Sequence, residues 1–322
     1  MPRISVLVPT YRRLTDLARC LDALERQDRP AHEIVVVVRD TDSESYAYLL
    51  SRRCAGLLKI VIVTESGVVA AMNRGLSVAS GDIIALTDDD AAPHGDWLAK
   101  IDAHFASDGR IGGVGGRDYL YQGDDLQDGA SSAVGVLQWF GRVIGAHHIG
   151  TGPARDVDVL KGVNCAYRAD VLRELGFDQR LLGEGAQVHW ELALGLAIRR
   201  SGYRLIYDPT VKVDHYPSIR HDSDKRTNNE GDVLFNAVYN ETLAVWEHLP
   251  IWRRAAFLMW SAAIGTKIAP GVSIAIYLLM NGKPRVSQRM MVTARARLRA
   301  ICGNAHTSAP PAKREGQTPL LG

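Results

Sequence analysis

The chain has 322 residues, of which 46% are hydrophobic, so it is long enough for one large domain or two ordinary ones with a substantial core. Its four cysteines, Cys20, Cys54, Cys165 and Cys302, form no CxxC pair and no zinc-binding spacing, which argues against a disulfide framework and favours reduced thiols in the cytosol. The net charge of +2 hides an asymmetry, because residues 248–322 carry +10 and residues 1–247 therefore carry −8.

The first third of the chain alternates predicted strands and helices. Apolar runs predict strands at 4–8, 33–38, 59–63 and 83–86, and the stretches between them predict helices at 14–24, 45–54 and 68–79. Strands separated by helices indicate a parallel sheet with right-handed crossovers. Thr15 and Asp16 are candidate caps of the first helix. The first apolar run is too short for the core of a signal peptide, so we expect none.

Three adjacent carboxylates, Asp88, Asp89 and Asp90, follow the apolar strand Ile83–Leu86. Such a strand is most readily buried in a sheet, and adjacent anions repel each other unless a cation or hydrogen-bond donors lie among them. Asp88 and Asp90 share a direction if the strand geometry continues, and oxygen ligands at a strand end suit Mg²⁺ or Mn²⁺. The other interpretation is an acidic loop, or caps for a helix at His94–Phe105.

Polar residues gather at the carboxyl ends of the predicted strands. Thr10, Tyr11 and Arg12 follow the first strand, Asp40 follows the second, and Asp88–Asp90 follow the fourth. In open parallel sheets, ligands bind outside these ends. The pattern therefore predicts a ligand site along this edge.

The middle of the chain is rich in glycine. Ile111–Gly116 lacks the GxGxxG spacing and opens no obvious helix, so we expect a strand with close backbone approach. Residues 119–153 are polar and predict a mobile loop over a site. Within them, His147 and His148 are adjacent, so their rings diverge, and we expect structural or solvated roles.

Five segments in this order resemble family 2 glycosyltransferases. They are Ser5–Arg12, the stretch from Asn73 to Asp82, Asp88–Asp90, Lys161–Arg168 on the acceptor side, and Gly202–Pro209 as the closing strand. The resemblance covers residues 3–217. It implies an α/β GT-A fold, a mostly parallel nucleotide-binding sheet flanked by helices, which we assign to residues 1–247.

The resemblance also implies roles for residues at matching positions. Those of the nucleotide pocket would be Pro9, Thr10, Arg12, Asn73 and Asp88. Asp40 would stand near the uracil or ribose, although residues 38–43 depart from the family's usual acidic pattern.

A metal site follows from the same resemblance. Asp90 would bind the metal, Asp88 would face the ribose or the metal, and His215 would complete the site. An imidazole with carboxylates is acceptable to Mn²⁺, and Mg²⁺ is the alternative ion. His215 could otherwise be an ordinary surface histidine.

The match to the family is imperfect at the catalytic base. Inverting members usually carry a Glu-Asp pair, then one residue and an acid-Leu pair. Here Glu191 and Leu192 match the acid-Leu pair, and His189 falls where the catalytic Asp would be. A histidine of near-neutral pKa can accept the proton of an acceptor hydroxyl, and Glu191 and Glu184 are its rivals. Glu191 could otherwise be a surface salt-bridge residue.

The implied reaction is a metal-dependent, inverting transfer of a sugar from a UDP- or GDP-linked donor. The acceptor would be a hydroxyl of a glycan or a lipid-linked molecule in cell-surface glycan or glycolipid synthesis. One alternative is a nucleotidyltransferase of sugar phosphates, but residues 9–13 lack the glycine-rich loop of those enzymes. The other is a non-catalytic nucleotide-sugar-binding protein, against which the intact acidic triplet argues.

The C-terminal region, residues 248–300, predicts a helical membrane-associating segment. Ala255–Met280 would reach about 39 Å as one helix, enough to span a bilayer, but Lys267 and Pro270 lie in its middle. Two short helices, Ala255–Ile264 and Val272–Met280, fit better in or on the interface. A basic segment can bind nucleic acid or anionic lipid, and the apolar content around it favours lipid. Positive flanks on both sides indicate that its ends stay at the cytoplasmic face of the membrane. The alternative is a buried helical pair. We expect residues 301–322 to be disordered.

Overall fold

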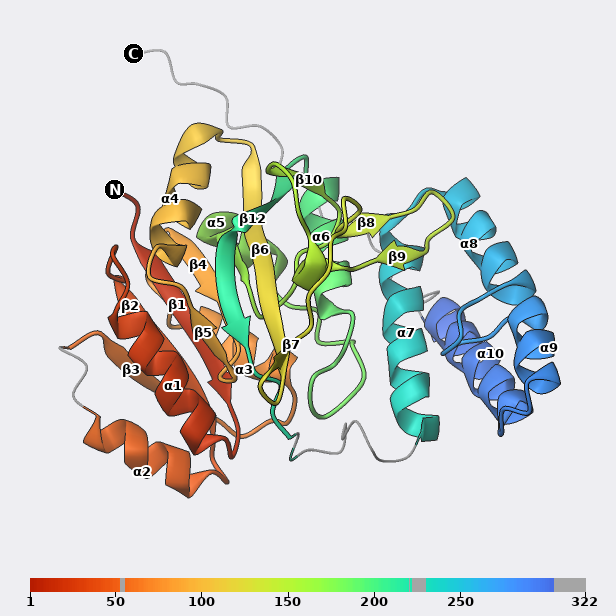
Figure 1. Ribbon diagram of the computed structural model, residues 1–322, viewed down its shortest axis with the longest axis horizontal. Helices are drawn as coiled ribbons and strands as arrows, with labels where there is room; N and C mark the ends of the chain where they lie inside the picture. Colours follow the sequence, from red (N-terminus) through yellow and green to blue (C-terminus); the bar gives the residue numbers. More distant parts are fainter. Residues whose placement is uncertain (53–55, 220, 222–229, 304–322) are drawn as a thin grey trace, which may run out of the picture.

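A computed structural model describes residues 1–52, 56–219, 221 and 230–303. One ten-stranded mixed sheet forms its centre, with the strand order β10-β12-β6-β11-β4-β1-β2-β3, while β5 pairs with β12 and β7 with β6 (Figure 1). The strands are β1 (Ile4–Thr10), β2 (Glu33–Arg39), β3 (Leu58–Val63), β4 (Ile83–Leu86), β5 (Ala91–Pro93), β6 (Ile111–Gln122), β7 (Asp125–Leu126), β10 (Arg155–Val157), β11 (Cys165–Arg168) and β12 (Arg204–His215).

The predicted parallel half of the sheet is confirmed. β4, β1, β2 and β3 are neighbours in that order, and every pairing among them is parallel. Helix α1 (Leu14–Glu25) packs on one face through residues such as Leu21, and α3 (Val68–Leu76) packs on the other through residues such as Met72. Because side chains alternate along a strand, Leu7 joins the α3 core and Val6 joins the α1 core.

The other half of the sheet is mixed, which adds antiparallel strands to the expected pattern. β11 lies between β4 and β6 and is antiparallel to both, while β12 is parallel to β6. The glycine run of β6 does form a strand with close backbone approach: a Cβ at Gly116 would lie 1.9 Å from the carbonyl oxygen of Val211. This contact leaves room for no other residue type.

Residues 119–153 are not a mobile loop over a site. They contain the end of β6, β7, the hairpin of β8 (Val136–Leu137) and β9 (Val143–Ile144), and the 3₁₀ turn His147–Ile149. Backbone hydrogen bonds hold them in place, including Gly135 N to Gly145 O at 2.9 Å. His147 is buried and its Nε2 lies 2.9 Å from Val159 O, a structural role.

Several helix ends differ from their predicted positions. α1 begins at Leu14 as predicted, but neither Thr15 nor Asp16 caps it, because the Asp16 carboxylate bonds to Arg19 and Ser218 instead. The second helix, α2 (Ser43–Ser51), starts earlier because Asp42 caps it, and the predicted end at Cys54 lies outside the described residues. The helix expected at 94–105 is α4 (Trp97–Ser107).

The C-terminal helices extend away from the sheet (Figure 1). After α5 (Ala169–Leu175) and α6 (Trp190–Arg200), helix α7 (Glu230–His248) packs against α6 and against α10 (Val286–Gly303). The two predicted short helices are α8 (Ile251–Ala263) and α9 (Val272–Met280), and no helix in the described part of the chain could cross a bilayer. We predicted a disordered tail at residues 301–322, but residues 301–303 are the last residues of α10, and residues 304–322 lie outside the described residues. The domain boundary between residues 247 and 248 stays a prediction.

Glu33 joins three strands and a turn. Its Oε1 accepts hydrogen bonds from Ser5 Oγ at 2.5 Å and from Ser80 N at 2.6 Å, and its Oε2 pairs with Lys59. Burial alone would raise the pKa of Glu33, but the hydrogen bonds from Lys59, Ser5 and Ser80 lower it to about 2. The ionised side chain therefore stabilises the fold at neutral pH.

We expect Glu33→Gln to lower the free energy of unfolding by about 1–3 kcal/mol at pH 7. The contribution of the ionised carboxylate is complete above its unfolded pKa and is lost as pH falls through its folded pKa of about 2. The difference in stability between the two proteins should therefore shrink between pH 5 and pH 2. Urea unfolding measures both, with Glu174→Gln on the exposed side of α5 as the control. Equal stability at pH 7 would contradict this role.

Candidate active site

A cavity of about 570 Å³ lies at the carboxyl ends of β1 and β4. Its wall combines segments that are far apart in sequence: Pro9–Tyr11 and Arg13, Ser66–Val68, Asp88–Asp90, Lys161–Val163, Glu184–Ala186, Trp190–Glu191, and His215 with Ser218. Thr87, directly after β4, holds the Lys161–Val163 segment through a 3.0 Å hydrogen bond to Val163 O. The position agrees with the predicted ligand edge of the sheet.

Asp88, Asp90 and His215 come together in this wall. One ligand atom from each lies within 4.8 Å of the others. The strand pairing explains this, because β5 follows Asp90 directly and pairs with β12, so that His215 lies opposite Ala91. Asp90 Oδ1 is buried without a hydrogen-bond partner among the described residues, and His215 Nε2 lies 3.5 Å away. The donor set fits a divalent cation.

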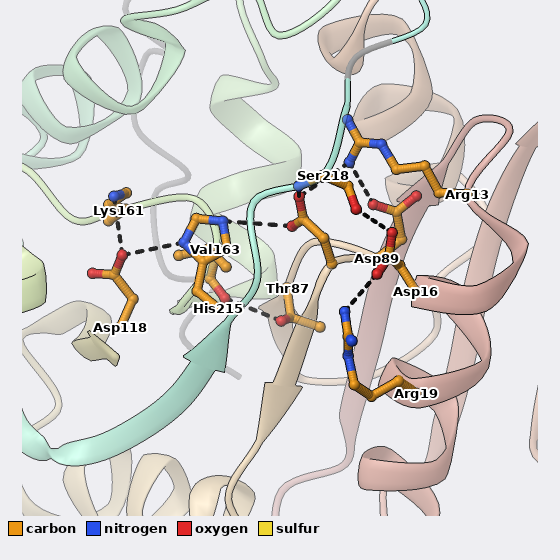
Figure 2. A network of polar contacts seen from close by, with 11 residues as sticks. Arg13, Asp16, Arg19, Thr87, Asp89, Asp118, Lys161, Val163, His215 and Ser218 are labelled. Carbon is orange, nitrogen blue, oxygen red and sulfur yellow. Dashed lines mark hydrogen bonds and ion pairs between the residues drawn. The ribbon is translucent and has the colours of Figure 1, made fainter. Parts of the chain in front are cut away.

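Asp118 supports His215 from behind. Its Oδ2 lies 3.4 Å from His215 Nδ1 and 3.0 Å from Lys161 Nζ (Figure 2). The side chain is fully buried, yet the hydrogen bond from His215 and the charge of Lys161 lower the pKa of Asp118 against the effect of burial. An Nδ1 proton directed at this carboxylate leaves Nε2 as the ligand atom facing Asp90.

The middle carboxylate, Asp89, is satisfied by the protein. Arg13 Nη1 lies 2.7 Å from Asp89 Oδ1 and 3.3 Å from Asp90 Oδ2, and Thr10 Oγ1 donates to Asp89 Oδ2 at 2.8 Å. Ser218 N donates to Asp90 Oδ2 at 3.1 Å. Protein donors therefore occupy Asp89 and one oxygen of Asp90, and Asp88 and the second Asp90 oxygen remain for another partner.

The charges around the site do not balance. Acidic side chains outnumber basic ones: Asp88, Asp89, Asp90 and Asp118 stand beside Glu184 and Glu191, whereas the cationic side chains are Arg13, Arg39 and Lys161. Burial, together with the charge of Asp90, raises the pKa of Asp88 to about 6. A bound divalent cation would offset part of this negative excess and favour the ionised carboxylates.

Only some of the residues predicted to bind the nucleotide line the cavity. Pro9, Thr10 and Asp88 line the cavity, but Arg12, Asp40 and Asn73 do not. Arg12 has a φ of +56°, and its guanidinium lies over the Tyr11 ring, so that Arg13 points into the site instead.

Asp40 and Asn73 have other partners. The Asp40 carboxylate is exposed and lies 3.5 Å from Arg39 Nε, and it is Arg39 that reaches the cavity wall. The Asn73 amide donates to Phe177 O at 2.8 Å and accepts from Phe177 N at 3.0 Å. These bonds fasten α3 to the segment after α5, which is a structural role.

Only two of the three candidate bases lie in the cavity wall. Glu191 and Glu184 line the cavity, and His189 does not. His189 has a φ of +74° and precedes the first residue of α6, so the chain reverses there and Glu191, in the first turn, faces the site. The charge of Glu191 contributes to the raised pKa of Asp88, which places the two carboxylates in one electrostatic environment.

Sequence reasoning did not identify Arg13 and Asp118 as site residues. Arg13 stands beside the expected Arg12, and only the backbone turn decides between them. Asp118 belongs to no motif, and only the pairing of β6 with β12 brings it next to His215. Lys161 lies in a segment whose resemblance was noted, but its bond to Asp118 was not foreseen.

A family model and a curated relative both match this chain, and both are described as glycosyltransferases. The family model described as "Glycosyl transferase family 2" matches residues 5–176. "Glycosyltransferase AglE" of Haloferax volcanii is 28% identical over 195 residues, which are 59% of this chain and 60% of that protein. The chain thus spans less than two thirds of the length of this curated relative.

Two solved structures show the same fold at low identity. A mannosyltransferase from Pyrobaculum calidifontis, solved with GDP-Man and Mn²⁺, has a TM-score of 0.54 at 18% identity and matches 96% of this chain and 88% of its own. S. aureus TarS 1-349, solved with UDP-GlcNAc, has a TM-score of 0.59 at 14% identity, with 94% and 91% covered. These likenesses agree with an α/β fold of the GT-A type.

We expect Asp118→Asn to raise the dissociation constant for Mn²⁺ by about tenfold to a hundredfold, because His215 loses the carboxylate that orients it. Asp90→Asn should weaken binding at least as much, since it replaces a ligand. Electron paramagnetic resonance of free Mn²⁺ measures both without any donor present. Asp125→Asn on the exposed strand β7 is the matched control.

Circular dichroism establishes that each variant is folded. Native affinity in both Asp90→Asn and Asp118→Asn would place the cation elsewhere.

Proposed function

This chain belongs to glycosyl transferase family 2, and we propose that it transfers a sugar from a nucleotide-sugar donor to a hydroxyl acceptor with inversion at the anomeric carbon. The observation that carries the proposal is the cluster of Asp88, Asp90 and His215 in the wall of a 570 Å³ cavity that also contains Glu191. A cation site and a carboxylate base in one cavity are what such a displacement requires.

The donor is proposed to be UDP- or GDP-linked, because the two solved structures of this fold contain GDP-Man and UDP-GlcNAc. Asp88, Asp90 and His215 would hold Mn²⁺ or Mg²⁺ beside the diphosphate. When bound, the cation would neutralise the negative charge that develops on the leaving group. Lys161 and Arg39 are further cations in the cavity wall.

Glu191 is proposed to be the base. The acceptor hydroxyl oxygen forms a bond to the anomeric carbon while the bond from that carbon to the donor phosphate oxygen breaks. The hydroxyl proton passes to the Glu191 carboxylate, and the nucleoside diphosphate leaves with the electron pair. Glu184 is in the same wall but exposed, and His189 lies outside it.

The loop that carries Glu184 is held firmly against the rest of the site. Gly185 O accepts from Val68 N at 2.8 Å, and Gln187 Oε1 accepts from Val69 N at 3.0 Å. Asn240 of α7 binds the same loop from the other side, donating to Val188 O at 3.0 Å. These bonds fix the loop that leads into α6, so Glu191 in the first turn of that helix is held in place. A fixed base favours catalysis by orientation.

The proposal is tested by incubating the full chain with a panel of UDP- and GDP-sugars, Mn²⁺ and extracted glycolipid acceptors. We expect release of the nucleoside diphosphate from one donor and loss of that release in EDTA. Pyrophosphate formed from a sugar phosphate and a nucleoside triphosphate would instead indicate a nucleotidyltransferase. Donor binding with no release from any donor would indicate a non-catalytic binding protein.

We expect Glu191→Gln to lower kcat by about two to four powers of ten, with a much smaller change in the donor KM, because an amide cannot accept the proton. Glu184→Gln makes the same change in the same wall and serves as the matched control. His189→Ala should retain kcat within about tenfold. Near-native turnover in Glu191→Gln, with a large loss in His189→Ala, would transfer the role to His189.

A further inference from the structure

Helix α8 turns an apolar stripe toward solvent. Trp252, Ala255, Met259 and Ala262 are exposed and follow helical spacing, and Trp252 and Met259 are 60% and 66% exposed. The opposite side of the helix, with Phe257 fully buried, packs on the protein. An amphipathic helix on a soluble domain normally points its polar side outward. This helix has apolar residues on both sides.

Helix α9 continues the exposed apolar surface. It has no charged residue, and only Ala275 and Leu278 are buried. The exposed large residues are Val272, Ile276, Tyr277, Leu279 and Met280. Together α8 and α9 form the part of the described chain farthest from the sheet (Figure 1). Exposed large apolar side chains gathered on two helices that contact each other indicate a site of interaction.

The charged residues of the segment that carries this surface are of one sign, although Arg297 among them is buried beside Glu241 of α7. Residues 248–303 contain nine Lys or Arg and no Asp or Glu. Lys267, Lys283 and Arg285 flank α9 and are exposed. A second copy of the chain packed symmetrically here would bring two sets of positive charges together. An anionic lipid surface matches both the apolar stripe and the surrounding charge.

The apolar surface is fastened to the sheet domain. Arg253 donates to the carbonyl oxygens of Gln138 and Trp139, each at 2.9 Å, and the Phe140 ring lies 5.3 Å from Trp260. Trp139, in the turn between β8 and β9, is 63% exposed beside α8. On the far side of the connecting loop, Arg289 donates to Ile268 O at 2.8 Å. The helices therefore do not form a separate appendage.

We propose that α8 and α9, with Trp139, form a lipid face that binds the surface of an anionic bilayer. The helices lie along the interface, since neither crosses it, and Trp139 and Trp252 lie at the level of the headgroups. The cytoplasmic leaflet, with its anionic lipids, is the matching surface. Binding of this kind does not depend on the proposed sugar transfer, and it would bring a lipid-linked acceptor to the enzyme.

The test measures sedimentation of the full chain with vesicles, without donor or cation. The face variant carries Met259→Glu and Ile276→Glu. The matched control carries Tyr46→Glu and Leu50→Glu, two exposed residues of α2, so both variants change the net charge equally. Vesicles of phosphatidylcholine alone are compared with vesicles containing phosphatidylglycerol. Thermal unfolding by circular dichroism verifies that both variants are folded.

We expect the native chain and the control to bind the phosphatidylglycerol vesicles within about twofold of each other, and the face variant at least tenfold more weakly. Binding should weaken as salt rises, because part of the attraction is electrostatic. The proposal is overturned if the native chain does not bind anionic vesicles, or if the face variant binds as the control does. It is also overturned if light scattering shows a vesicle-free dimer that the face variant dissociates, since a second copy would then cover the face. Nucleoside diphosphate release, measured separately, reports on the sugar transfer alone.

Discussion

Three adjacent carboxylates at the end of β4, of which Asp89 and Asp90 are buried and Asp88 is partly buried, are the constraint on which the site depends. Ionised groups are costly to bury unless each finds a partner, and neighbouring anions increase the cost. The protein assigns them different partners. Arg13 and Thr10 bind Asp89, and Arg13 and Ser218 bind one oxygen of Asp90. The excess negative charge is left on Asp88 and the other Asp90 oxygen, beside His215, so the same contacts that stabilise the strand end also define where a cation fits.

The strand order places these partners where the carboxylates need them. β5 is only three residues long, but its pairing with β12 fixes His215 next to Asp90. The pairing of β12 with β6 then brings Asp118 behind His215. Three strands, β5, β12 and β6, thus bring together Asp90, His215 and Asp118, the carboxylate that orients the histidine. A shift of one residue in either register would turn these side chains to the opposite face.

The parallel half of the fold could be predicted because its signal is local. Each of β1 to β4 is an apolar run between helices, and period and length identify it. The antiparallel insertion of β11 between β4 and β6 could not, since it rests on pairing between distant segments. The site shows the same limit. Asp88, Asp90 and His215 were found from motifs, but the turn at Arg12 decides that Arg13 enters the cavity, and the turn at His189 decides that Glu191 does. Asn73 carries a motif position, yet its amide is used by Phe177.

The division of charge along the chain has a mechanical consequence if the lipid face binds as proposed. Residues 1–247 carry −8 and the rest carry +10, so an anionic surface attracts one end of the molecule and repels the other. Such a charge distribution orients a protein on a membrane in addition to holding it there. Helix α7 would transmit that orientation, because it packs on α10 at one side and its Asn240 binds Leu182 and Val188 at the other. The loop that completes the cavity is therefore anchored to α7, which packs on α10, and α10 in turn contacts α9 of the lipid face. Through these contacts the cavity would keep a fixed direction relative to the bilayer.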